Sequence, residues 1–136
     1  MDTVATRRVE IPARKGRPMK GPLGIHVLYD LYRCQKEALD DPAELNRLLL
    51  EAVTEAQMTP LESASHKYTP QGVSVVVLVA ESHISIHTWP EYDYAAADFF
   101  SCRTDVDPER VRAVLARTLN PERIEMQIIQ RGTGVF

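Results

Sequence analysis

Residues 73–102 constrain the fold most, because they hold three strand-like segments separated only by short breaks. VSVVVLVA is a run of mainly aliphatic, β-branched residues, SHISIHTW alternates polar and apolar residues, and YAAADFFSC carries two adjacent aromatic residues. Residues of these types favour extended backbone. Three consecutive strands predict that a β-sheet forms the centre of this molecule.

Three further strands are expected, in GIHVLYDLYRC, in the weaker TPLESASHKYT, and in the alternating RIEMQIIQR near the end of the chain. Pro70, Gln71 and Gly72 form a turn signal between two of the six strands. Only two helices accompany these strands. The pattern therefore predicts an α+β two-layer sandwich, with both helices on one face of a largely antiparallel sheet.

Both helices have clear start signals. In DDPAELNRLLLEAVTEAQM, Asp41 is placed to cap the helix, Pro42 suits the first helical position, and Glu44 completes a capping-box-like pattern. Asp107 and Pro108 start the second helix in the same way. The apolar stripes at helical spacing are Leu45, Leu48, Leu49, Ala52, Val53 and Ala56 in the first helix, and Val111, Val114, Leu115 and Leu119 in the second.

Composition narrows the class of protein. The length of 136 residues and a hydrophobic content of 44% indicate one globular domain. A net charge of −3 argues against a nucleic-acid binder, and no apolar run is long enough for a membrane span or a secretory signal. With two cysteines, Cys34 and Cys102, a disulfide scaffold is excluded and a cytoplasmic protein is expected.

The N-terminal residues differ from the rest of the chain. Residues 1–20 contain six basic and two acidic residues and show no sustained periodicity. We expect residues 1–22 to form a basic flexible leader and residues 23–136 to form the domain. VATRRVEI within the leader is an alternative edge strand. A basic leader could also contact nucleic acid or an acidic surface, although a solvated leader is favoured.

The segment AESHISIHTWPEY concentrates reactive groups. His83 and His87 are four residues apart, but along a strand this spacing is about 13 Å, too far for one metal ion. A hydrolase using Ser82 or Cys102 with His87 stays open, although the G-x-S-x-G motif is missing. A third interpretation is that the polar residues simply form the exposed face of an alternating strand.

The long motif GVSVVVLVAESHISIHTWPEYDYAAADFFSC closely resembles the processing region of the prokaryotic S-adenosylmethionine decarboxylase proenzymes. These are self-cleaving, pyruvoyl-dependent enzymes of polyamine synthesis. LGIHVLYDLYRC, HKYTPQG and RIEMQIIQRG extend the resemblance over about residues 23–132. Decarboxylation of an amino acid needs an electron sink, which a cofactor usually supplies. The resemblance implies that this chain makes its own sink, a pyruvoyl group, and that no metal is needed.

The resemblance also implies a role for each residue of the processing motif. Ser82 would attack the carbonyl carbon of Glu81, and elimination would convert Ser82 into the pyruvoyl group that forms a Schiff base with substrate. His87 would remove the Cα proton of Ser82, because imidazole titrates near neutral pH. Ser74 would hydrogen-bond to the processing intermediate, and Cys102 would reprotonate the decarboxylated carbon.

The resemblance places the substrate contacts at Tyr68, Trp89 and Glu91. Tyr68 matches a family phenylalanine that stacks on adenine together with His87, and Glu91 is placed to bond ribose hydroxyls. The implied substrate is S-adenosylmethionine. Family members assemble as dimers of cleaved chain pairs, so a homodimer or higher homo-oligomer is expected.

The chain departs from the family pattern at four positions. Val75 and Arg103 replace glycines, Ile25 replaces an arginine, and Asp93 replaces the glycine of WPEYGYAA. Val75 and Asp93 could favour a compact cation, so a pyruvoyl-dependent arginine or ornithine decarboxylase is the alternative, with Asp93 as a tentative substrate ligand.

A non-catalytic regulatory partner of an active paralogue is a lower-ranked alternative. Such a protein should have lost Ser82, His87 or Cys102, and this chain retains all three.

Overall fold

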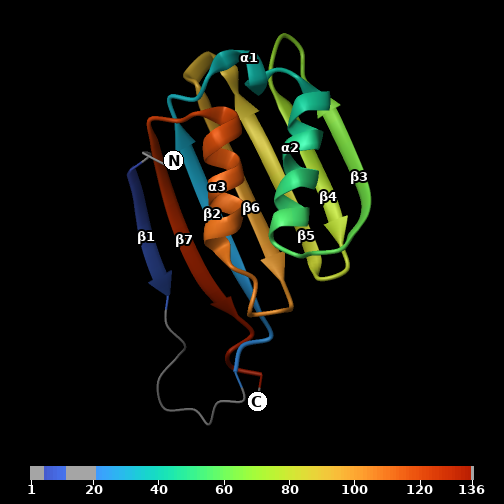
Figure 1. The fold of residues 1–136 in the computed structure, drawn as a ribbon, viewed down its shortest axis with the longest axis vertical. Coiled ribbons are helices and arrows are strands. Elements are labelled where there is room, and N and C mark those ends of the chain that lie inside the picture. The colour runs from blue at the N-terminus through green and yellow to red at the C-terminus, as the bar shows by residue number, and fades with distance from the viewer. Residues whose placement is uncertain (1–4, 12–20, 136) are drawn as a thin grey trace.

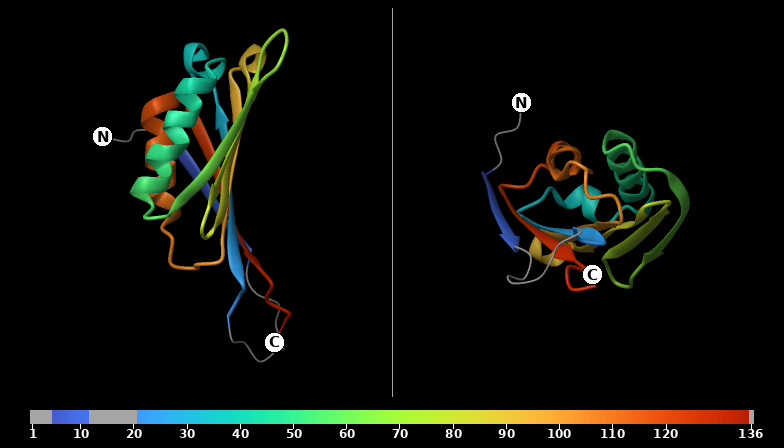
Figure 2. Two further views of the ribbon diagram at one scale, coloured as in Figure 1. Left: turned by 90° about the vertical axis from the view of Figure 1, so that its right-hand side faces the viewer. Right: turned by 90° about the horizontal axis from the view of Figure 1, so that it is seen from below.

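The computed structural model describes residues 5–11 and 21–135, which form one seven-stranded sheet with helices packed on one face (Figures 1 and 2). The elements, in chain order, are β1 Ala5–Ile11, β2 Gly24–Tyr32, α1 Lys36–Leu39, α2 Pro42–Glu55, β3 Pro60–Lys67, β4 Val73–Val79, β5 Ser82–Trp89, the 3₁₀ helix η1 Pro90–Tyr92, β6 Tyr94–Ser101, α3 Pro108–Leu119 and β7 Arg123–Arg131. Within the described ranges, no helix is long and apolar enough to cross a membrane.

The strand order is β1-β7-β2-β6-β5-β4-β3. The pairs β3–β4, β4–β5, β5–β6, β2–β6 and β2–β7 are antiparallel, and only β1 pairs with its neighbour in parallel. All six predicted strands and both main helices are present. The predicted α+β two-layer sandwich is therefore confirmed.

The N-terminal segment contributes a seventh strand. Ala5–Ile11 pairs in parallel with β7, from Ala5 opposite Arg123 to Ile11 opposite Ile129, and lies at one edge of the sheet (Figure 1). The edge strand, which was the alternative to a flexible leader, is thus found over these residues. Residues 12–20, which hold the rest of the basic leader, lie outside the described residues.

The helix starts follow the predicted capping, with one correction. The Asp41 carboxylate accepts the backbone N–H groups of Ala43 and Glu44 at 3.1 and 3.2 Å, as expected for an N-cap. The capping box at Glu44 is wrong, because its carboxylate accepts from the Arg47 guanidinium instead. The short elements α1 and η1 were not predicted, since neither has an apolar period of its own.

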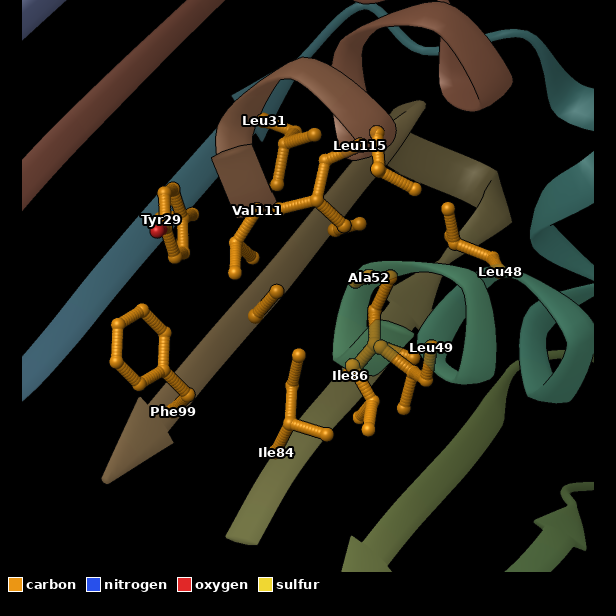
Figure 3. Packing of buried hydrophobic residues seen from close by; sticks show 14 of the residues in the cluster. Tyr29, Leu31, Leu48, Leu49, Ala52, Ile84, Ile86, Phe99, Val111 and Leu115 are labelled. Atoms are coloured by element: carbon orange, nitrogen blue, oxygen red, sulfur yellow. The ribbon is translucent and has the colours of Figure 1, made fainter. Parts of the chain in front are cut away.

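The hydrophobic core lies between the sheet and the helices α2 and α3. Ile84 and Ile86 of β5 point toward the helix layer, where Figure 3 shows Ile86 near Leu49 and Ala52 of α2. Both isoleucines are almost fully buried. Complete burial of such side chains stabilises the fold by about 1.5–3 kcal/mol each. The four buried valines of β4 belong to the same layer: Val73, Val75, Val77 and Val79.

Among the described residues, none of the helices α1, α2 and α3 covers the other face of the sheet, which we call the open face (Figure 2). Successive side chains of a strand point to opposite faces, so the residues between the core positions all lie here. The chemically active members of this face are His26, Ser74, His83, Ser85, His87 and Asp98. The polar-face interpretation of the strand was therefore correct in geometry, and it also gathers the reactive groups on one surface.

Candidate active site

The Glu81–Ser82 peptide lies at the tight turn between β4 and β5, where Val79 pairs with Ser82. Ser82 has a φ of 154°, a region that residues with a side chain rarely occupy. Such backbone strain costs on the order of 1–3 kcal/mol and is concentrated at functional sites. The peptide that the motif predicts to break is therefore held in a strained conformation.

Glu81, on the N-terminal side of this peptide, is anchored through both its carbonyl and its carboxylate. The backbone N–H of Cys102 donates to the carbonyl oxygen of Glu81 at 2.9 Å. The Glu81 carboxylate accepts the backbone N–H of Thr59 at 2.9 Å. A hydrogen-bond donor on the Glu81 carbonyl polarises it toward nucleophilic attack and can stabilise the oxyanion that attack creates.

The strand pairing also fixes the position of Cys102. Ser101 pairs with Ser82 across β5 and β6, so Cys102 is adjacent to the Glu81–Ser82 bond, and it is exposed. Cys34 is buried, and burial, with the nearby Asp93 charge, raises the pKa of its thiol to about 12. Of the two thiols, only Cys102 is accessible and beside the cleavage position.

The Arg103 side chain is held by contacts with Asp105, Gln57 and Glu81. Its guanidinium donates to Asp105 at 3.0 Å and to the carbonyl of Gln57 at 3.0 Å, and lies 3.8 Å from the Glu81 carboxylate. The arginine that replaces a family glycine thus joins the anchor of Glu81.

A second group forms at the other end of β5. Ser74 and His87 are directly opposite each other on β4 and β5, and Ser74 Oγ lies 2.8 Å from His87 Nδ1. The Tyr68 hydroxyl is 3.2 Å from the same Ser74 oxygen. These three residues line a pocket of about 320 Å³ with Trp89 and Glu91. The structure therefore brings together five of the predicted site residues.

The structure does not bring Ser82 to this pocket. Ser82 and His87 are five residues apart on one strand, which corresponds to roughly 16 Å. Ser82, Glu81 and Cys102 form one half-site, and Tyr68, Ser74, His87, Trp89 and Glu91 form the other. Within one chain the proton acceptor predicted for processing cannot touch the serine on which it would act.

Asp93 lies beside the second half-site and outside its pocket. It lines a neighbouring pocket of about 550 Å³ with Tyr32 and Arg123, and Glu91 lines both pockets. The Asp93 carboxylate is 3.8 Å from the Lys36 ammonium. Asp93 has a φ of 53°, the left-handed conformation that glycine adopts most easily. This backbone requirement explains a glycine at that position without reference to substrate.

Val75 is also explained by the fold. It is fully buried under the helix layer, on the face opposite the pocket. The idea that Val75 narrows the substrate pocket is therefore wrong, because its side chain points into the core.

One cluster was missed in the sequence. His26, His83 and Asp98 bring two imidazole Nε2 atoms and a carboxylate oxygen within 4.8 Å of one another on the open face. They come from β2, β5 and β6, and β2 and β5 both pair with β6, so only the sheet order reveals their proximity. The alternation of SHISIHTW predicts a polar face for His83 alone, and strand order cannot be deduced from one sequence.

The surroundings of this cluster favour a hydrogen-bonded network over metal ligation. An Arg131 nitrogen is 3.3 Å from His26 Nδ1, so that nitrogen accepts and Nε2 carries the proton donated to Asp98 at 2.6 Å. A metal-bound histidine normally donates its other N–H to an acceptor. The Arg131 guanidinium beside His26 Nδ1 is a donor, so Nδ1 cannot donate to it. Its positive charge would also repel a metal ion bound nearby.

Comparison with known proteins identifies the family. Residues 25–132 match the sequence profile of S-adenosylmethionine decarboxylase. The chain is 44% identical over 110 residues to the S-adenosylmethionine decarboxylase proenzyme of Methanococcus vannielii, covering 81% of this chain and 90% of that protein. The corresponding protein of Thermosipho melanesiensis is 42% identical over 110 residues, with 81% and 85% covered.

Solved structures agree. The crystal structure of adenosylmethionine decarboxylase from Aquifex aeolicus is 38% identical, with a TM-score of 0.76, and the match covers 82% of this chain and 92% of that chain. A Trypanosoma brucei AdoMetDC monomer, 14% identical with a TM-score of 0.55, shares the fold. The fold and the site motif thus define a self-processing decarboxylase class. The chain belongs to the S-adenosylmethionine decarboxylase family.

Proposed function

We propose that this protein is a proenzyme that cleaves itself between Glu81 and Ser82 and then decarboxylates S-adenosylmethionine. The scissile peptide supports this most strongly: Ser82 is strained, and the Glu81 carbonyl accepts the Cys102 N–H. The relatives described above are S-adenosylmethionine decarboxylase proenzymes, and the match covers most of this chain. Together these observations favour an active enzyme over a non-catalytic partner.

Processing starts when Ser82 Oγ attacks the Glu81 carbonyl carbon and the peptide becomes an ester with a free Ser82 amine. His87 then removes the Cα proton of Ser82, and Glu81 leaves as a carboxylate. The dehydroalanine that results takes up water and releases ammonia to give the pyruvoyl end of the chain beginning at residue 82. When formed, the pyruvoyl ketone binds the substrate amine and accepts electrons as carbon dioxide leaves.

The remaining residues act on the substrate. Cys102, beside residue 82, donates the proton that replaces the lost carboxylate. Tyr68 and the His87 imidazole stack on the adenine, while Trp89 and Glu91 line the same pocket. Asp93 lies in the neighbouring pocket, where its carboxylate is 3.8 Å from the Lys36 ammonium, so a distal cation of arginine or ornithine would have to compete with Lys36 for it. This arrangement favours S-adenosylmethionine as the substrate.

A second copy of the chain is needed to join the two half-sites. In a two-fold dimer formed by the open faces, the Ser82 end of β5 in one copy can approach the partner's His87 end. The open face carries exposed apolar side chains suited to burial in such an interface, with Leu78 47% and Trp89 40% exposed. We therefore propose a homodimer of cleaved chain pairs, acting in the cytoplasm, with each site shared.

The test is intact mass spectrometry followed by carbon dioxide release. Purified protein should consist of two fragments, Met1–Glu81 and a pyruvoyl-blocked chain from residue 82. Ser82→Ala should give one uncut chain. Carbon dioxide should come from S-adenosylmethionine and not from arginine or ornithine. A single full-length mass in an active preparation would exclude the pyruvoyl mechanism.

A further inference from the structure

The network missed in the sequence lies directly beside the scissile bond. Ser82 Oγ is 3.5 Å from His83 Nδ1, and His83 Nε2 is 3.3 Å from Asp98 Oδ2. The same Asp98 oxygen accepts from His26 Nε2 at 2.6 Å. Ser82, His83 and Asp98 thus form a continuous chain of hydroxyl, imidazole and carboxylate within a single copy of the protein.

Asp98 is held as an anion by several donors. Ser85 Oγ donates to Asp98 Oδ1, and the two histidines contact Oδ2. Burial alone would raise the pKa of Asp98, but the hydrogen bonds from Ser85 and His26 and the nearby His83 outweigh it and lower the pKa below its usual value. A carboxylate that stays ionised near neutral pH can orient and stabilise an adjacent imidazolium.

The neighbours of His83 fix its useful tautomer. Because Asp98 is an acceptor, His83 donates from Nε2, and Nδ1 is left with a lone pair toward Ser82. The Phe100 ring stacks on His83 with an interplanar angle of 11° and restricts its rotation. A neutral imidazole held in this way accepts a hydroxyl proton, the role that histidine has beside serine nucleophiles generally.

We propose that His83 is the general base that activates Ser82 for the first processing step, with Asp98 as its positioning residue. The inference rests on the proposed self-cleavage and adds a residue to it. It also divides the work between two copies: the ester forms within one chain through His83, and His87 of the partner copy then carries out the elimination.

The step balances without any co-reactant. His83 Nδ1 takes the Ser82 hydroxyl proton while Oγ bonds to the Glu81 carbonyl carbon, and the oxyanion accepts the Cys102 N–H. The Glu81–Ser82 carbon–nitrogen bond then breaks. The His83 imidazolium returns its proton to the Ser82 nitrogen, and the products are the ester and a free amine.

His87 is a poor candidate for this first proton. Within its own chain, His87 lies roughly 16 Å from Ser82 along β5. Its Nδ1 is also already engaged by Ser74 at 2.8 Å. His83, by contrast, neighbours Ser82 in the same chain and needs no partner to reach it.

The experiment separates ester formation from elimination. All variants are made in a His87→Ala background, where elimination is slowed and the ester accumulates. Hydroxylamine attacks the ester at Glu81, leaving a hydroxamate there and a chain that starts with intact serine at position 82. The protein is translated and purified on ice, and cleavage at this bond is then followed by mass spectrometry. The measured quantity is total cleavage, which is the sum of spontaneous and hydroxylamine-dependent cleavage.

His83→Ala should lower the rate of total cleavage by about 100-fold or more, the usual contribution of general base catalysis. Free imidazole should restore part of the loss. His83→Gln, which keeps a polar side chain of similar length, should be equally slow and checks the result if the alanine variant folds poorly. His66→Ala, a histidine on β3 outside this network, is the matched control and should cleave at the background rate.

Asp98→Asn tests the positioning role. It should slow ester formation when His83 is present and have no further effect in a His83→Ala chain, because it acts through that ring. A role in stability alone would give the same loss in both chains.

Unchanged ester formation in both His83 variants would overturn the inference. That outcome is distinct from failure of the proposed function, in which the unmodified protein itself shows no cleavage at Glu81–Ser82.

Discussion

Ile86 and His87 are neighbours in β5 and lie on opposite faces of the sheet. Ile86 is buried against the helix layer, while His87 pairs with Ser74 on the open face. Along β5, His83, Ser85 and His87 alternate with Ile84 and Ile86, and in β6 Asp98 lies between the buried Ala97 and Phe99. One short segment can therefore build the core and the active site together, because the two requirements fall on alternate residues.

The comparison also explains the crowding of histidine, serine and aspartate near the middle of the chain. The central strands of a sheet are the most rigid support available, and their open face is accessible for chemistry. Function here depends on residues that contribute little to the core, and stability depends on residues that contribute nothing to the chemistry. Substitutions at the adjacent positions 86 and 87 should therefore separate the loss of stability from the loss of processing.

His87→Ala and Ile86→Ala should have opposite consequences. The histidine variant should fold with nearly unchanged stability and lose processing by orders of magnitude, because its proton acceptor is gone. The isoleucine variant should lose about 2–5 kcal/mol of unfolding free energy through the cavity it leaves. Chemical denaturation and intact mass measured on both variants check this. If the His87→Ala protein is as destabilised as the Ile86→Ala protein, the two faces of β5 do not have separate roles in stability and in chemistry.

Cys102→Ala should cleave itself and then turn over poorly. Its backbone N–H, which contacts the Glu81 carbonyl, is retained, whereas the thiol that we propose as the proton donor is lost. We expect kcat to fall by about 100-fold, as for removal of a general acid, with substrate also transaminating the pyruvoyl group during turnover. Carbon dioxide release and fragment masses measure the two effects. Full activity would remove Cys102 from the reaction.

Tyr68→Ala should weaken substrate binding without preventing cleavage of the chain. Loss of stacking on adenine is expected to cost about 1–3 kcal/mol, by analogy with nucleic-acid bases stacked on aromatic side chains. This corresponds to roughly 5- to 150-fold in kcat/KM for S-adenosylmethionine. Steady-state kinetics with Tyr68→Phe as control check it, because phenylalanine keeps the ring. If alanine and phenylalanine behave alike, the ring does not contact the base.

Asp93→Gly should have the smallest effect. Glycine accommodates the left-handed backbone at this position, so the unfolding free energy should rise by up to about 1 kcal/mol, less the exposed ion pair with Lys36. Activity toward S-adenosylmethionine should be unchanged. Thermal denaturation and kinetics test both statements. A large loss of arginine or ornithine turnover would instead make Asp93 a substrate ligand.

Much of this architecture was predictable because it depends on local patterns. The alternation of SHISIHTW placed His87 on a polar face, and the capping residues Asp41 and Asp107 marked both main helices. The motif named most of the candidate site residues. What a single sequence could not give is long-range geometry, namely the parallel edge strand β1 and the meeting of His26, His83 and Asp98, since both follow from strand order.

The separation of the two half-sites could not be predicted from the sequence motif for a related reason. Ser82 and His87 are close in sequence, which suggests a common site, but an extended strand carries them apart. Only the strand pairing shows that Cys102 belongs with Ser82, and that Ser74 belongs with His87. The chemistry could thus be inferred from the motif, while the proposal that the two half-sites combine across copies rests on the fold.

Co-expression of two inactive variants tests the shared site most directly. A Ser82→Ala chain and a His87→Ala chain, each with its own tag, are produced alone and together, and the masses of both chains are measured. Alone, the Ser82→Ala chain should stay uncut, and the His87→Ala chain should give almost no pyruvoyl-blocked fragment. Together, the His87→Ala chain should be cleaved at Glu81–Ser82, because its intact Ser82 meets His87 of the Ser82→Ala partner. If the mixed complex forms and the His87→Ala chain still remains whole, the two half-sites do not combine across copies.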